Sequence, residues 1–112
     1  MFRKKNKLPS FLFPRVLKDG EKKENNYFKI VFKKNDFSFP RVGIIVSSKI
    51  SKLAVKRNLL KRRIRNIIKE FLPLFSSNWD IIIIAKKDLL SLSYSQEREE
   101  LKKILSRILK LK

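Results

Sequence analysis

The segment from Lys49 to Glu70, KISKLAVKRNLLKRRIRNIIKE, most narrows the folds open to this chain, because it reads as a long helix with two different faces. When the residues are plotted around a helix at about 100° per residue, the apolar ones fall within a sector of roughly 100°. This is the apolar stripe of a helix that packs on a core. Its members are Leu53, Leu60, Ile64, Ile67, Ile68 and Phe71. The adjoining side carries Arg57, Asn58, Lys61, Arg62, Arg65 and Lys69. Nine Lys or Arg residues stand against one acid in this segment, so the second face presents positive charge with little compensation.

A strand is expected on each side of this helix. RVGIIVSS, Arg41 to Ser48, leads into the helix. WDIIIIA, Trp79 to Ala85, follows it as a continuous apolar run, which is typical of a strand covered on both faces. Strand, helix and strand in this order predict a parallel pair. Gly43, inside the first strand, indicates a close backbone approach or a bulge.

Three further elements complete the prediction. A short helix is expected from Ser10 to about Lys18, and YFKIVFKK, Tyr27 to Lys34, is an alternating strand. Ser93 and Gln96 form the pattern of a capping box, which opens a last helix from about Tyr94 to Leu111. EKKENN, between the first helix and the alternating strand, reads as a polar loop.

The order of elements predicts an α/β fold of the α+β sandwich type. Helix, two or three strands, helix, strand and helix would place one layer of helices on a mixed sheet, which has four strands if a third strand precedes the basic helix. In the alternating strand, Phe28, Ile30 and Phe32 form the core face. The other face mixes aromatic, aliphatic and cationic groups, which suits a bound nucleotide chain as well as it suits partial exposure. Its residues are Tyr27, Lys29, Val31 and Lys33.

Length and charge limit what the chain can do. Its 112 residues are enough for one domain, with residues 1–9 as a flexible basic arm. The formal net charge of +19 and the pI near 10.6 exceed what solubility needs, so we expect a polyanionic partner, with nucleic acid ahead of an anionic membrane. No run reaches the roughly 18 apolar residues of a membrane span, and the N-terminus lacks the apolar core of a signal peptide. We therefore expect a cytoplasmic protein without a membrane partner.

The sequence is poorly equipped for catalysis. It contains no Cys and no His, which excludes a thiolate nucleophile, an imidazole base and the usual zinc ligands. The ten acids are scattered, and Glu97, Glu99 and Glu100 fit the first turns of a helix. These features predict a protein that binds RNA or DNA without cutting it. A basic ribosomal protein is the main alternative, followed by a DNA-binding module and a membrane-surface peptide.

The run from Val42 to Ile68 resembles the signature of the bacterial ribonuclease P protein subunit. In that family a strand VGxxVSKK enters a helix that carries Arg-Asn-Arg, then Lys-Arg and a further Arg. The matching positions here are Arg57, Asn58, Lys61, Arg62 and Arg65. FPRVLKDG from Phe13 and WDIIIIAKKDLLSLSYSQ from Trp79 are similar to other parts of the family, so the resemblance covers nearly the whole chain.

Three positions depart from the family pattern. Leu59 replaces the third residue of Arg-Asn-Arg, Ser48 replaces the first lysine before the helix, and Leu17 replaces an aromatic residue of the first helix. Leu59 lies away from the apolar stripe, so we expect one phosphate or backbone contact to be lost there.

The resemblance implies a function and a fold detail. It implies a subunit that binds the catalytic RNA of ribonuclease P and the 5′ leader of precursor tRNA, without requiring a protein partner. The RNA would carry out the phosphodiester hydrolysis and bind most of the magnesium, with no organic cofactor. The helix would join its two parallel strands by a left-handed crossover, although general rules favour the right-handed one.

The resemblance also assigns residues to two RNA partners. The expected RNA-binding residues are Lys49, Lys52, Lys56, Arg57, Asn58, Lys61, Arg62, Arg65 and Lys69. Among them, Arg62 and Lys69 would turn more towards the catalytic RNA. The cleft for the leader would be lined by Phe13, Leu17, Tyr27, Lys29 and Val31.

Overall fold

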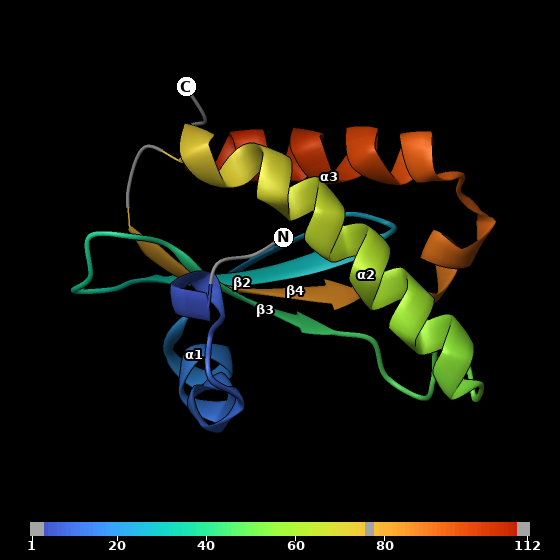
Figure 1. Ribbon diagram of the computed structural model, residues 1–112, viewed down its shortest axis with the longest axis horizontal. Helices are drawn as coiled ribbons and strands as arrows, with labels where there is room; N and C mark the ends of the chain where they lie inside the picture. The colour runs from blue at the N-terminus through green and yellow to red at the C-terminus, as the bar shows by residue number, and fades with distance from the viewer. Residues whose placement is uncertain (1–3, 76–77, 110–112) are drawn as a thin grey trace.

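A mixed four-stranded sheet in the order β1-β2-β4-β3 forms the centre of the molecule (Figure 1). The computed structural model describes residues 4–75 and 78–109. The strands are β1 (Glu21–Glu24), β2 (Phe28–Lys34), β3 (Arg41–Ile45) and β4 (Trp79–Ala85). β3 and β4 pair in parallel, which confirms the parallel pair expected from strand, helix and strand. The other two pairings are antiparallel.

Three helices cover this sheet, and they lie on both of its faces. They are α1 (Phe13–Asp19), α2 (Ala54–Phe71) and α3 (Tyr94–Leu109). Figure 1 shows α2 and α3 together on one side of the sheet and α1 on the other. The mixed sheet with three helices is thus confirmed, but the expected single helical layer is wrong. Helices lie on both faces because β4, WDIIIIA, is apolar on both faces, and each apolar face must be covered.

The alternation along β2 and β4 divides the core into two clusters. Phe28, Ile30, Ile81 and Ile83 belong to the larger cluster, which α2 and α3 close. Val31 and Ile82 point the other way and form the smaller cluster with Val16 of α1 and Leu8, to which Phe13 and Leu17 add partly buried side chains. Both faces of β4 are therefore buried, as its continuous apolar run predicts.

The N-terminal part of the chain differs from the prediction in two ways. A flexible arm was expected over residues 1–9, of which residues 1–3 lie outside the described residues. Residues 4–9 lie along β3: the Leu8 N–H donates to the Val42 carbonyl at 3.0 Å, and Asn6 Nδ2 donates to the Pro40 carbonyl at 2.8 Å. Leu8 is buried, so an apolar residue between basic ones anchors the segment. The supposed loop after Gly20 instead begins with β1, an exposed edge strand that lacks an apolar pattern and pairs through its backbone.

The short turns and the helix ends complete the fold. The 3-10 turns are η1 (Lys4–Asn6), η2 (Ser10–Leu12), η3 (Leu72–Leu74) and η4 (Lys87–Ser91). The capping box before α3 is confirmed, because Ser93 N donates to Gln96 Oε1 at 2.9 Å and Gln96 N donates to Ser93 Oγ at 3.2 Å. The predicted end of this helix at Leu111 lies outside the described residues. Within those residues, no helix is long and apolar enough to cross a bilayer.

Candidate nucleic-acid interface

Helix α2 has one buried face and one open face, as its sequence predicts. Its buried residues are Leu60, Ile64, Ile67, Ile68 and Phe71. Leu53, which was expected in the same stripe, is 59% exposed and precedes the helix in an extended conformation. The buried stripe therefore begins at Leu60, about two helical turns later than predicted, because helical periodicity does not apply before Ala54.

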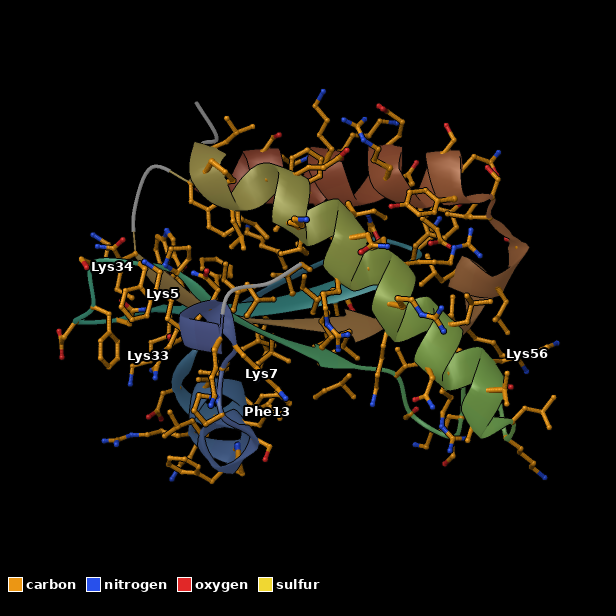
Figure 2. All side chains as sticks on the ribbon, viewed as in Figure 1. Lys5, Lys7, Phe13, Lys33, Lys34 and Lys56 are labelled. Carbon is orange, nitrogen blue, oxygen red and sulfur yellow. The ribbon has the colours of Figure 1, made fainter. Side chains whose placement is uncertain are left out.

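The polar residues predicted to bind RNA lie on the open side of α2 and on the loop that leads into it. The exposed ones are Lys49, Lys52, Lys56, Asn58, Arg62, Arg65 and Lys69, and the half-buried ones are Arg57 and Lys61. Lys56 is labelled near the N-terminal end of the helix in Figure 2. Arg57 also has a structural bond, since its Nη1 donates to the Ser51 carbonyl at 2.8 Å and holds the preceding loop.

Arg63 belongs to the same basic run but has a different role. Its Nη2 lies 3.2 Å from Oε1 of Glu97, a buried residue in the first turn of α3, and its guanidinium lies over the Tyr94 ring at 5.5 Å. Burial raises the pKa of the Glu97 carboxyl, and the charge of Arg63 opposes that rise. Arg63 thus joins α2 to α3 and is withdrawn from the open cationic surface.

A groove of about 460 Å³ separates α2 from the N-terminal segment. Helix α2 contributes Lys61 and Arg65 to one wall, and Phe13 contributes an aromatic ring. The remaining lining residues are Lys4, Lys7, Leu8, Ser10, Val42, Gly43 and Ile44. Figure 2 shows Lys7 and Phe13 near each other beside β3. The groove therefore combines an apolar floor with cations on two sides.

A second hollow of about 470 Å³ lies on the open side of α2. It is lined by Asn58, Lys61, Arg62, Arg65 and Asn66. Lys61 and Arg65 also line the groove, so these two side chains form the ridge between the two hollows. Such a ridge can contact phosphates on either side of the helix.

The residues predicted to line a leader cleft do not all come together. Phe13 and Leu17 both pack on the smaller cluster, and Phe13 reaches the groove. Val31 has no exposed surface because α1 covers it, so its placement in an open cleft is wrong. Tyr27 packs against the larger cluster instead, although alternation along the strand predicted otherwise. Lys29 is half-buried in β2 opposite Ile84.

Sequence reasoning missed the contribution of the N-terminal segment to the groove. Lys4, Lys7 and Ser10 line it because Leu8 is buried and the backbone of this segment bonds to β3. The available signal was Leu8 itself, an apolar residue in an otherwise basic stretch. In the described part of the chain, no three acidic side chains come together closely enough to hold a metal ion, and the residues that line the groove include no acid.

The mixed sheet, the three helices and the cationic groove define a small basic α+β protein whose open surface suits a polyanion. The sequence model described as Ribonuclease P matches residues 2–109, and the chain belongs to the family of bacterial ribonuclease P protein components.

Individual proteins of this family are similar to the chain in sequence and structure. The ribonuclease P protein component of Mesoplasma florum is 38% identical over 104 residues, which cover 90% of this chain and 92% of that protein. The component of a Cyanothece species is 42% identical over 67 residues, so this chain spans only 51% of that relative's length. A Staphylococcus aureus RNase P protein mutant, described as defective in mRNA degradation activity, superposes with a TM-score of 0.87 at 30% identity. That match covers 97% of this chain and 92% of the mutant's chain.

Proposed function

We propose that this protein is the protein subunit of a cytoplasmic ribonuclease P ribonucleoprotein, which removes the 5′ leader of precursor tRNA. The RNA subunit performs the hydrolysis and binds most of the magnesium. Family membership supports the assignment, together with a sequence that has neither His nor Cys. The protein contributes binding and charge, because its net charge of +19 offsets repulsion between two RNA molecules.

The groove between α2 and the N-terminal segment supports this function most directly, because it suits a single-stranded leader. A single-stranded leader has unstacked bases that can contact an aromatic ring, while its phosphates need cations. Phe13 supplies the ring, and Lys61 and Arg65 supply cations on the facing wall. Since contacts of this kind accept any base, the protein should bind leaders with little sequence preference.

The outer side of α2 is assigned to the catalytic RNA. Arg62 lines the hollow on that side, and Lys69, Lys56 and Lys52 are exposed along the helix and its leading loop. These side chains are free to contact the backbone of a folded RNA, where phosphate contacts position the protein. Lys61 and Arg65, on the ridge, can serve both RNAs.

Reconstitution tests the proposal directly. The purified protein alone should leave precursor tRNA intact. With ribonuclease P RNA added, mature 5′ ends should form at a lower magnesium concentration than the RNA requires by itself. Cleavage by RNA-free protein, or an unchanged magnesium requirement, would contradict the assignment.

A further inference from the structure

We propose that the loop between β2 and β3 carries a second site for single-stranded RNA, and that the RNA bound there is the part of the leader upstream of the groove. The inference rests on the proposed function, because it extends the leader's path across the surface. It concerns residues 35–40 and the cations that surround them, none of which belongs to the basic helix.

The loop presents two aromatic rings with a cation against each. The rings of Phe37 and Phe39 stack with their centroids 5.3 Å apart and their planes inclined by 29°. The Arg41 guanidinium carbon lies 4.4 Å from the centroid of Phe37, and Lys5 Nζ lies 5.2 Å from the centroid of Phe39. We name Phe37, Phe39, Arg41 and Lys5 the aromatic platform. Phe37 is 46% exposed, so the platform offers aromatic surface for an incoming base.

Hydrogen bonds hold this loop in shape. Asn35 Oδ1 accepts from the Phe37 N–H at 2.9 Å, and Asn35 Nδ2 donates to Asp80 Oδ1 at 2.9 Å. Arg41 donates to both oxygens of Asp80, at 2.8 Å from Nε and 2.6 Å from Nη2. Because the rings and the guanidinium are fixed beforehand, binding a base loses little additional conformational entropy.

The surroundings of the platform are cationic. A hollow of about 310 Å³ beside Phe37 is lined by the basic residues Arg15, Lys33, Lys34 and Arg41. Two acids also line it. Asp80 and Arg41 pair with each other, which leaves Arg15, Lys33 and Lys34 against Asp36, and Lys33 also lies 3.8 Å from Asp19 outside the hollow. Figure 2 shows Lys5, Lys33 and Lys34 gathered at this end of the sheet. Aromatic rings with nearby cations are the combination that binds single-stranded nucleic acid without sequence preference.

The N-terminal segment connects the platform to the groove. Lys4 and Lys7 line the groove, and Lys5, between them in sequence, reaches the ring of Phe39. Asn6 ties the same turn to the loop through its bond to the Pro40 carbonyl. An RNA strand that leaves the groove along this segment meets the platform next. The segment upstream of the bound leader nucleotides is therefore the occupant that fits.

The test measures how leader length affects binding to the reconstituted holoenzyme. Precursor tRNAs with a leader of about five or about fifteen nucleotides are compared, a range that spans typical single-strand site sizes. In the wild type, the longer leader should bind at least about fivefold more tightly, the effect of stacking one base. Phe37→Ala should abolish this gain. Phe37→Leu, which keeps the apolar volume but removes the aromatic face, should abolish most of it.

Leu90→Ala is the matched control. Leu90 has the same exposed fraction of 46%, but it lies in η4, which follows the opposite end of β4. This variant should keep the whole gain from the longer leader.

Two outcomes would overturn the inference while the proposed function stands. One is that both Phe37 variants keep the full gain, and the other is that they weaken binding of short and long leaders equally. Failure of the proposed function has a different signature: the wild-type holoenzyme would then bind precursor tRNA and mature tRNA equally well, and the inference would fall with it.

Discussion

The ring of Phe13 packs directly against the backbone of Gly43, in the space that a side chain at position 43 would occupy. A Cβ built on Gly43 would overlap the ring. The requirement for glycine in β3 is therefore steric, and it couples α1 to the floor of the groove. Of the two meanings that a glycine in this strand can have, close approach is confirmed.

Gly43→Ala should push the Phe13 ring out of its position. Overpacking of this kind typically costs about 1 to 3 kcal/mol of unfolding free energy, which urea unfolding would measure. In a Phe13→Ala background the ring is absent, so the same substitution should cost clearly less. Additive effects of the two substitutions would show that the ring and the glycine do not constrain each other.

Stability should depend on pH through Glu97. Because burial raises its pKa above the ordinary 4.5, the folded chain holds this proton more tightly than the unfolded chain does. The contribution of Glu97 therefore favours folding at low pH and is lost as pH rises through the window between the ordinary and the raised value.

Glu97→Gln cannot titrate, so it should gain stability relative to the wild type as pH rises through that window. Urea unfolding of both proteins between about pH 4 and pH 8 measures the difference. If the unfolding free energy of Glu97→Gln minus that of the wild type stays constant or falls with rising pH, the Glu97 carboxyl is solvated or fully compensated by Arg63.

Affinity for the catalytic RNA should fall steeply with salt. Each phosphate neutralised adds about 0.7 to 0.9 to the slope of log K against log salt, so Arg62→Ala and Lys69→Ala should each reduce the slope by about one. Lys87→Ala, which removes an exposed lysine of η4, is the control and should leave the slope unchanged. Equal slopes for all three variants would mean that the outer side of α2 faces solvent in the complex.

Local patterns in the sequence predicted the elements well. The buried face of α2 and the capping box at Ser93 follow from residue spacing alone, and WDIIIIA was recognised as a strand with two covers. Strand β1 was missed because Glu21–Glu24 has no apolar residue, and an edge strand can form through backbone bonds alone. Alternation along β2 identified the two faces but could not tell which part of the second face α1 would bury, so Val31 was misplaced.

The site was harder to predict because identical residue types have different surroundings. Arg62 and Arg63 are neighbours in sequence, yet only Arg63 meets a buried carboxylate, and that contact depends on where α3 packs. The groove likewise forms only because residues 4–9 pack on β3, and the buried side chain of Leu8 anchors them there. Tertiary packing, which sequence periodicity does not encode, determined both outcomes.

Lys61 lines the groove, so its replacement tests most directly whether the groove holds the leader. The measurement is the affinity of the reconstituted holoenzyme for precursor tRNA with a leader of about five nucleotides and for mature tRNA. Loss of one charge-assisted phosphate contact in Lys61→Ala should weaken precursor binding about five- to tenfold and leave mature tRNA binding nearly unchanged. Equal weakening of both substrates would contradict the claim and assign Lys61 to the catalytic RNA instead.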